Sequence, residues 1–227
     1  MCWLTTVATG SSGNCYLLNS DDETLVIEAG VPFMEVKKAL DFNVKRIACV
    51  VISHCHGDHA KYVHEYERFG IPVWKPYQDS NLRQKKAFGQ FTVWSFDNVH
   101  DVPCVGYQIT HPDGLRLMYA TDTQYVKYTF KNLTAMLVEM NWDEDYVDKK
   151  EPKYRHILKG HLSKQTSLDC IKANLNLSMS HIILCHLSDG HAHPAEFVTA
   201  VKEITPEFVT VDVAVPGVKT DLSEIPF

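Results

Sequence analysis

The sequence of 227 residues lacks the features of a secreted or membrane-spanning chain. No apolar run approaches the roughly 18 residues that are needed to cross a bilayer. The first residues, Met1 to Thr6, carry neither the basic segment nor the apolar core of a secretion signal. The seven cysteines include no C-x-x-C pair, which argues against a disulfide framework and a cysteine-type zinc site. We therefore expect a cytoplasmic protein that has reduced thiols and no membrane association.

Positive charge is also scarce, because 22 Lys and Arg residues face 28 Asp and Glu residues and the net charge is −6. This balance excludes a surface coated in basic charge for non-specific binding to nucleic acid, although it leaves room for a local basic track. A hydrophobic content of 45%, with 10 Phe and 10 Tyr residues, excludes a disordered chain. The sequence contains no low-complexity linker and no short repeat, so we expect one domain over residues 1–227 with a tail from Gly217 to Phe227.

Short apolar runs flanked by turn residues predict strands, and runs with an apolar period of about 3.6 residues predict helices. The expected strands are Leu4–Thr9, Cys15–Asn19, Thr24–Glu28, Ile47–Ser53, Phe91–Phe96, Val105–Thr110, Arg116–Ala120, Ala135–Met140, His181–Cys185 and Phe208–Val213. The expected helices are Phe33–Leu40, Asp58–Phe69, Lys164–Ala173 and Pro194–Glu203. Because strands dominate the first third and helices interleave later, we expect an α/β domain of packed sheets with helices outside.

Histidine is the residue in excess, with 12 in the chain, and it is concentrated in one segment. Ser53-His54-Cys55-His56-Gly57-Asp58-His59 follows a buried strand and precedes a helix, at the strand end where α/β sheets build their sites. His54 and His56 are two residues apart and can point to the same side, whereas Asp58 and His59 enter the helix and point elsewhere. One segment can thus serve two neighbouring metal positions, with ligands that suit zinc, iron or manganese.

One more histidine or aspartate follows each of three further expected strands. His100, Asp122 and His186 each come just after an expected apolar strand. Any one of them alone would be an ordinary polar surface residue. Together with the segment from His54 to His59, they predict a cluster of metal ligands.

The pattern H-x-H-x-D-H from His54 to His59 resembles the signature of the metallo-β-lactamase superfamily. Within that superfamily, the chain is similar to the YycJ/WalJ-type branch of nucleases. The matching stretches are Gly10-Ser11-Ser12-Gly13-Asn14-Cys15, His54 to His59, His100-Asp101 followed by Gly106-Tyr107, Thr121-Asp122-Thr123, Gly160-His161-Leu162-Ser163 and His186-Leu187-Ser188. The resemblance spans residues 10–188 and implies a four-layer αββα sandwich with a two-metal site at one edge.

The resemblance also implies a ligand set and a reaction. The first metal would be held by His54, His56 and His100, the second by Asp58, His59 and His186, and Asp122 would bridge both. The two divalent ions, zinc by default with manganese or iron as alternatives, would share a hydroxide that attacks phosphorus in line. Asp58 and Asp122 are accordingly expected to be catalytic carboxylates as well as ligands.

His161 has an expected role that comes from the resemblance alone. In ribonuclease Z-like enzymes, a histidine in a motif comparable to Gly160-His161-Leu162-Ser163 protonates the leaving group or holds the phosphate. We therefore expect His161 to be catalytic. The alternative is a histidine that only packs against or caps the following helix, for which Ser163 is the expected N-cap.

Two segments are candidates for contact with a substrate. Residues 149–159 form the most basic run of the chain and could guide a phosphodiester backbone, or could be a solvated loop. The turn of residues 9–14 could place backbone NH groups near a phosphate, or could be a plain hairpin turn. The candidate substrate-binding residues are Ser11, Ser12, Asn14, Lys153, Arg155 and Lys159.

Two positions depart from the pattern of the branch. Glu28, in Glu28-Ala29-Gly30, stands where the branch has aspartate, and this change bears on the support of the metal ligands. Trp142, in Asn141-Trp142-Asp143, stands where the branch has histidine, and this change bears on the handling of nucleic acid.

The leading hypothesis is a dinuclear metal-dependent phosphodiesterase that acts on nucleic acid, of the DNA exonuclease kind. The acidic net charge favours an alternative, a small-molecule metallo-hydrolase acting on a cyclic nucleotide, a phosphodiester, a thioester or a lactam. A third hypothesis is a non-enzymatic metal-binding regulator, against which the complete ligand set argues. The sequence indicates no oligomeric state.

Overall fold

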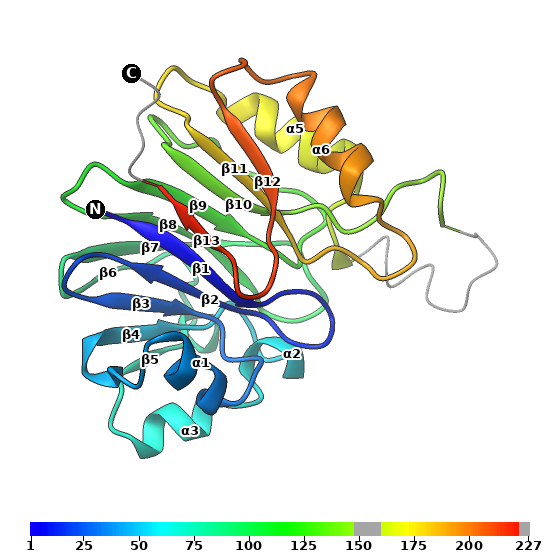
Figure 1. Ribbon diagram of the computed structural model, residues 1–227. Helices are drawn as coiled ribbons and strands as arrows, with labels where there is room; N and C mark the ends of the chain where they lie inside the picture. Colours follow the sequence, from blue (N-terminus) through cyan, green and yellow to red (C-terminus); the bar gives the residue numbers. More distant parts are fainter. Residues whose placement is uncertain (148–159, 223–227) are drawn as a thin grey trace.

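The computed structural model describes residues 1–147 and 160–222 and contains two β-sheets that face each other (Figure 1). The first sheet has six strands in the order β13 (Lys219–Asp221), β1 (Trp3–Ala8), β2 (Cys15–Asn19), β3 (Thr24–Ile27), β4 (Ile47–Val51) and β5 (Val73–Trp74). The second has seven strands in the order β12 (Thr210–Val213), β11 (His181–Cys185), β10 (Ala135–Glu139), β9 (Arg116–Ala120), β8 (Val105–Thr110), β7 (Phe91–Asp97) and β6 (Lys85–Phe88).

Helices lie on the outer side of each sheet (Figure 1). The helices are α1 (Phe33–Ala39) and α3 (Val63–Arg68) beside the first sheet, α5 (Lys164–Asn174) and α6 (Pro194–Lys202) beside the second, and the single turn α2 (Gly57–Ala60). The expected four-layer αββα sandwich is therefore confirmed. Within the described residues, no helix is long and apolar enough to cross a membrane.

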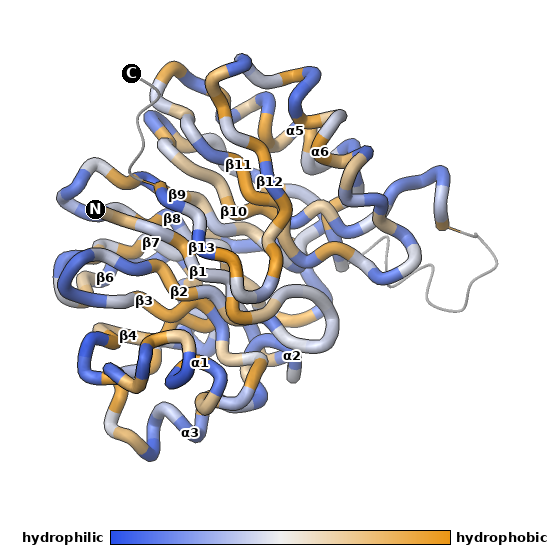
Figure 2. The backbone as a smooth tube through the Cα atoms, viewed as in Figure 1, coloured by the Kyte–Doolittle hydropathy of each residue, from blue (hydrophilic) through white to orange (hydrophobic). Residues whose placement is uncertain are grey.

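Three apolar cores separate the four layers. Between the sheets lie residues such as Tyr16 and Leu137, while their strand neighbours Leu17 and Met136 face the outer helices. This alternation follows from the two-residue period of a strand, and each sheet is covered on both faces. Apolar residues accordingly line the strands in Figure 2. Burial on both faces explains why strands such as β10 and β11 read as continuous apolar runs in the sequence.

The direction of the strands brings their polar ends together. Strands β3, β4 and β5 are parallel, as are β9, β10, β11 and β12. Strand β7 is antiparallel to β8, which is antiparallel to β9, so β7 runs in the same direction as β9. The carboxyl ends of β7, β9 and β11 therefore meet at one edge of the second sheet, where ligand-binding loops are expected.

The expectation of a tail from Gly217 is wrong for its first part. Gly217 makes a turn with a φ of +83°, and Lys219–Asp221 then pairs antiparallel with β1 as β13. The backbone NH of Gly217 donates to Thr6 and that of Thr6 to Val218. This strand escaped the sequence analysis because it lies at the sheet edge and is exposed, so it lacks the apolar alternation that marks a half-buried strand.

The helix expected over Asp58–Phe69 is interrupted. Helix α2 ends at Ala60 and α3 begins at Val63. The backbone NH of Tyr62 donates to Ala29 rather than within a helix, at 3.0 Å, and this contact ties the break to the loop after β3. The edge strands β5 and β6 were also missed, because β5 has two residues and β6 is largely exposed.

Candidate metal centre

The loop after β4 is fixed against the loops after β1 and β3. The carbonyl of Asp58 accepts from the backbone NH of Asn14 at 2.7 Å, and that of His59 accepts from Ala29 at 2.7 Å. Gly30 allows this approach, since a Cβ atom there would lie 1.8 Å from the carbonyl oxygen of Asp58. His56 is the N-cap of α2, so the helix begins within the His54–His59 segment. These backbone contacts hold four candidate ligands in place.

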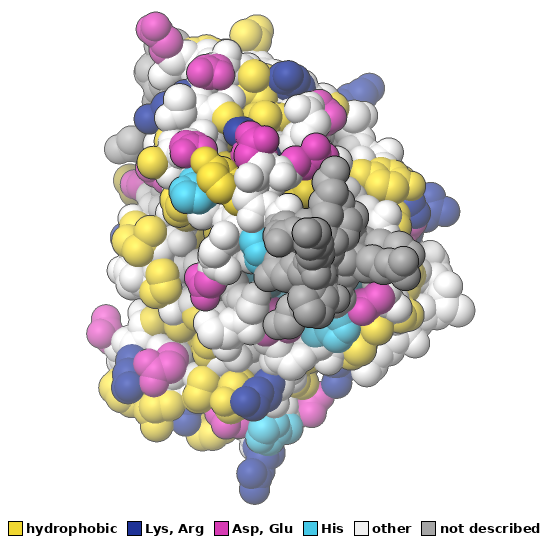
Figure 3. All heavy atoms as spheres, turned by 90° about the vertical axis from the view of Figure 1, so that its right-hand side faces the viewer, with side chains coloured by type: hydrophobic (Ala, Val, Ile, Leu, Met, Phe, Trp, Pro, Cys, Tyr) yellow, Lys and Arg dark blue, Asp and Glu magenta, His cyan; other side chains and the backbone are white. Residues whose placement is uncertain are grey.

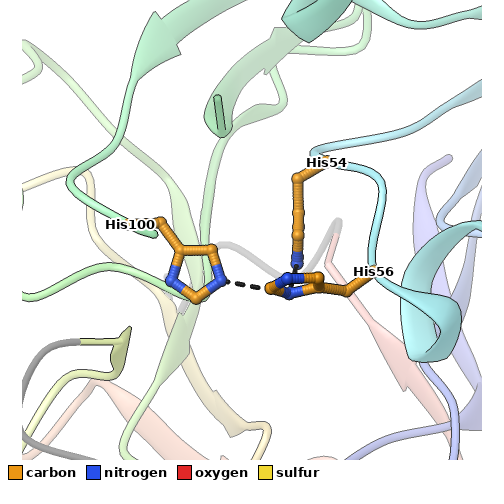
Figure 4. A group of neighbouring side chains, drawn as sticks. All are labelled: His54, His56 and His100. Atoms are coloured by element: carbon orange, nitrogen blue, oxygen red, sulfur yellow. Dashed lines mark hydrogen bonds between the residues drawn. The ribbon is translucent and has the colours of Figure 1, made fainter. Parts of the chain in front are cut away.

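His54, His56 and His100 form a first group of candidate ligands (Figure 4). Nδ1 of His56 lies 3.1 Å from Nε2 of His54 and 3.2 Å from Nε2 of His100. One proton can form a hydrogen bond between two of these nitrogens, but it cannot satisfy all three nitrogens that point toward one another. In a tetrahedral zinc site with Zn–N bonds of about 2.0–2.1 Å, the ligand nitrogens lie roughly 3.3 Å apart. The donor set therefore fits a metal ion.

Asp58, His59 and His186 form a second group. Oδ2 of Asp58 lies 3.3 Å from Nε2 of His59 and 3.4 Å from Nε2 of His186. Two imidazoles and a carboxylate are ligands that zinc, iron and manganese accept.

Asp122 lies between the two groups. Its Oδ2 is 3.1 Å from Nε2 of His59 and 4.0 Å from Nε2 of His186, and Asp122 also clusters with His54. The hydroxyl of Thr121 donates to the same oxygen at 2.7 Å, and the Asp122 backbone NH donates to Glu139. Asp122 therefore adjoins members of both groups.

Three of the six non-glycine residues with a positive φ in the described part of the chain lie at the candidate site. Glu28, Asp122 and His186 have φ angles of +69°, +51° and +51°, a region that residues other than glycine rarely adopt. Such conformations cost about 1–3 kcal/mol each and persist where the surroundings enforce them. All three lie at or near the carboxyl end of a strand, so the strain directs their side chains into the site.

Two buried glutamates lie behind the candidate ligands. Oε1 of Glu139 is 2.9 Å from Nδ1 of His186 and 2.7 Å from Nδ1 of His161, and its Oε2 accepts from the backbone NH of Asp122 and Leu162. Sequence reasoning missed Glu139, although it ends a buried strand just as the predicted ligands follow theirs.

Glu28 supports the second group in the same way. Its carboxylate lies 3.4 Å from Nδ1 of His59 and accepts from the Ser53 backbone NH and the Tyr119 hydroxyl. The departure from aspartate noted in the sequence therefore leaves a carboxylate against His59. The side chain of glutamate is longer than that of aspartate, and it reaches His59 from a backbone in the left-handed region.

The charge states of the two groups differ. Burial, reinforced by the neighbouring His59, lowers the pKa of His54 to about 2, and burial also lowers the pKa of His100. These imidazoles are neutral and offer lone pairs, as metal ligands must. Burial opposes the charge of His186, but Asp122, Asp58 and Glu139 outweigh it and raise its pKa to about 10. A cation that binds the second group would therefore replace protons.

His161 lies beside both groups. Its Nδ1 is 3.3 Å from Oδ1 of Asp122, and its ring stacks on that of His186 with centroids 5.3 Å apart. Burial opposes its charge, but Glu139 outweighs burial and raises the pKa of His161. Ser163 is the N-cap of α5, as expected, and its Oγ accepts from the backbone NH of Thr166. The helix is thus capped by serine, and His161 is directed to the carboxylates.

The candidate substrate-binding residues fall into three classes. Ser11 and Ser12 are exposed in the turn after β1. Asn14 is fully buried, and its Nδ2 lies 3.1 Å from Nε2 of His59, so it contacts a candidate ligand instead of facing solvent. The basic residues Lys153, Arg155 and Lys159 lie outside the described residues. On the face of the molecule that is shown in Figure 3, histidine side chains reach the surface beside acidic and apolar side chains.

Trp142 lies directly behind His161. Its Nε1 donates to the carbonyl of His161 at 3.4 Å, and its backbone pairs with Ser163. The preceding residue, Asn141, donates through Nδ2 to the carbonyl of His186 at 2.7 Å. Gly160 packs against the site from the other side, since a Cβ there would lie 3.3 Å from the His100 ring.

Comparison with known proteins finds a matching family model. A model of the metallo-beta-lactamase superfamily matches residues 8–116, a range that includes His54 to His59 and His100. Over these residues the chain is similar to the metallo-β-lactamase superfamily. It is a metal-dependent hydrolase. Asp122, His161 and His186 lie beyond the matched range, so their place in the site rests on the geometry described above.

Relatives of this chain include two proteins named as DNA exonucleases. The exodeoxyribonuclease YycJ of Bacillus anthracis is 24% identical over 213 residues, which cover 80% of this chain and 81% of the relative. The exodeoxyribonuclease WalJ of Streptococcus pneumoniae strain D39 is 26% identical over 215 residues, which cover 80% of each.

Solved structures share the fold at lower identity. YhfI of Bacillus subtilis has a TM-score of 0.71 at 16% identity and covers 96% of this chain and 98% of its own. A diphosphatase of the PhnP family has a TM-score of 0.64 at 13% identity, covering 97% and 98%. The short form of human tRNase Z has a TM-score of 0.63 at 14% identity, covering 97% and 99%.

Proposed function

We propose that this chain is a dinuclear metal-dependent phosphodiesterase that degrades DNA from an end. The observation that carries the proposal is the position of Asp122 between two groups of candidate ligands, with His161 beside them. The names of the YycJ and WalJ relatives support a DNA substrate. The seven free cysteines, six of them buried, suit the cytoplasm, where we place the enzyme.

The metals would be held by the residues predicted from the sequence. The first ion would bind His54, His56 and His100, the second would bind Asp58, His59 and His186, and Asp122 would contact both. When bound, the ions would supply Lewis-acid stabilisation of a phosphoryl group and make water acidic enough to attack at neutral pH. Zinc is the default for these ligands, and manganese or iron would fit the same set.

His161 would protonate the leaving oxygen. The carboxylate of Glu139 can only accept, so Nδ1 of His161 carries the proton in their 2.7 Å contact. Nε2 of His161 would then be the atom that donates a proton to the leaving oxygen. Glu139 also raises the pKa of His161, which keeps the ring protonated and able to act as a general acid.

A second candidate function keeps the metals and changes the substrate to a small phosphodiester or a cyclic nucleotide. The net charge of −6 favours it, as does the carboxylate of Asp101 at the rim of the first group.

The test is a substrate panel on the metal-loaded protein. Purified chain loaded with zinc or manganese is given bis-p-nitrophenyl phosphate, end-labelled single- and double-stranded DNA, RNA and a cyclic nucleotide. We expect hydrolysis of the nitrophenyl ester, together with stepwise shortening of labelled DNA that a chelator stops. Turnover of the cyclic nucleotide without DNA shortening would favour the second candidate. No turnover with any metal would contradict both enzyme functions.

A further inference from the structure

Asp101 lies at the rim of the first ligand group and has no part in the ligand sets described above. Its side chain is 50% exposed, and its Oδ1 lies 3.1 Å from Nε2 of His100 and 3.5 Å from Nε2 of His56. The contact to His56 involves the nitrogen that points away from the other histidines, because Nδ1 is the atom that faces them. Asp101 therefore reaches the outer side of a candidate ligand.

The loop that carries Asp101 is fixed to the loop that carries Asp122. Nδ2 of Asn98 donates to the carbonyl of Thr121 at 2.9 Å, and the Val99 backbone NH donates to the hydroxyl of Thr123 at 2.9 Å. The backbone NH of Gln124 donates in return to the carbonyl of Val99 at 3.0 Å. Asp101 is thus held near the histidines by the backbone, although its side chain is exposed.

Three of the other four candidate histidine ligands have an oxygen near the nitrogen remote from the cluster, whereas Nδ1 of His100 has no hydrogen-bond partner among the described residues. The nitrogen remote from the ligand cluster lies 2.8 Å from the Ser53 hydroxyl in His54, 3.4 Å from Glu28 in His59 and 2.9 Å from Glu139 in His186. An oxygen on the remote nitrogen fixes the tautomer and the ring orientation of a ligating histidine. In His56 the remote nitrogen is Nε2, and Oδ1 of Asp101 lies 3.5 Å from it.

We propose that Asp101 is a positioning residue for the first metal position. Its carboxylate lies close enough to Nε2 of His56 to favour the tautomer with the proton on Nε2, so that Nδ1 keeps its lone pair and faces the cation. Its negative charge beside His56 and His100 also favours a bound cation over the empty histidine group. The inference rests on the metal sites of the proposed function, but not on the substrate or on turnover.

The experiment measures metal affinity in Asp101 variants without any substrate. Zinc and cobalt affinities are determined by competition with a chelator for the full chain, for Asp101→Ala and for Asp101→Asn. The alanine variant should bind the ion of the first metal position about 10–100-fold less tightly than the parent chain does. A loss of this size is typical when the outer partner of a metal ligand is removed. Asparagine, which keeps an accepting oxygen but no charge, should lose less.

Matched controls separate positioning from a structural role. Asp212→Asn removes an equal charge from an exposed position on β12 and should leave metal affinity unchanged. Metal-free Asp101→Ala should unfold at the same temperature as the parent, because the aspartate is half exposed. The visible absorption of the cobalt-loaded Asp101→Asn protein should keep its intensity, since the ligands themselves are intact.

Three results would overturn the inference. The first is equal metal affinity in Asp101→Ala and the parent. The second is a loss of affinity in Asp212→Asn equal to that in Asp101→Ala. The third is a changed absorption intensity of cobalt-loaded Asp101→Asn, which would make Asp101 itself a ligand. A chain that hydrolyses no phosphodiester but loses metal affinity in Asp101→Ala would refute the proposed function and support the role of Asp101.

Discussion

His161 is the residue at which a catalytic role can be separated from metal binding. In His161→Ala, the candidate ligands stay in place, while the group that gives the proton to the leaving oxygen is lost. We expect full metal content and a fall in kcat of about 10²–10⁴, the usual contribution of general acid catalysis. Metal analysis and steady-state hydrolysis of labelled DNA measure the two quantities.

His64→Ala is the matched control for this change, because His64 is exposed on α3, outside the candidate metal centre. It should keep both metal content and kcat. If His161→Ala turned over as fast as the parent, His161 would have only a packing role. If it lost metal together with activity, the assignment of His161 as the acid would be contradicted.

Protons and metal should compete for the second ligand group. In the folded, metal-free chain the pKa of His59 is raised well above its ordinary value, as the Asp122 and Glu28 carboxylates outweigh burial, and the pKa of His186 is raised to about 10. Both rings are then protonated near neutrality, and a bound cation must displace those protons. Metal affinity should therefore rise with pH up to the pKa of the metal-free site.

Calorimetric titration with zinc in two buffers of different ionisation enthalpy measures this competition. The heat should reveal the release of protons on binding, and the affinity should increase between about pH 6 and pH 8. Binding without proton release, at an affinity independent of pH, would show that these two histidines are not displaced by the metal.

The sequence predicted the candidate ligands because each lies in a segment that follows a strand, where α/β sheets build their sites. The supporting carboxylates were harder to assign. Glu139 ends a strand, but nothing in its local sequence indicates contact with two histidines, one directly after β11 and one in the segment before α5. Asn14 was expected at the substrate, and its burial depends on how three loops dock.

At the scale of elements, the loop after β4 depends on the absence of a side chain at Gly30. In Gly30→Ala, the new Cβ would overlap the carbonyl oxygen of Asp58 and approach the backbone nitrogen of Asn14 within 2.6 Å. The backbone must shift, so we expect the free energy of unfolding to fall by about 1–3 kcal/mol, as in other overpacked positions. Metal content should fall too, because the shift displaces Asp58 and His59.

Gly57→Ala is the control for this variant, since a Cβ at Gly57 would meet no atom within 4 Å. Denaturant unfolding of the two metal-free variants compares their stabilities. Equal stability of Gly30→Ala and the parent would show that the loop tolerates a shift of this size, and the close contact would then have no structural importance.

The sequence predicts a strand well when burial on both faces of the sheet requires a continuous run of apolar residues. Strands β10 and β11 are buried along their whole length and are recognisable as continuous apolar runs. Strand β13 is exposed at the sheet edge, and its pairing with β1 is set by a turn at Gly217 rather than by a pattern within the strand. The break between α2 and α3 likewise depends on a tertiary bond, from Tyr62 to Ala29.

At the scale of the whole molecule, the net charge of −6 counts the carboxylates of the candidate metal centre. Asp58, Asp122, Glu28 and Glu139 all lie in or behind that centre. Two divalent cations would cancel their charge locally, and electrostatic reasoning at such a site must include the ions. The acidity of the chain therefore weighs little against a phosphate substrate.

The central claim is that Asp122 joins two metal positions into one hydrolytic centre. The measurement that tests it most directly is metal content and DNA end-shortening in the parent chain and in Asp122→Ala, at equal protein concentration. We predict two metal ions per parent chain with turnover, and fewer than two ions with no detectable turnover in the variant. Full activity in Asp122→Ala, or a fully active parent chain with a single metal ion, would contradict the account.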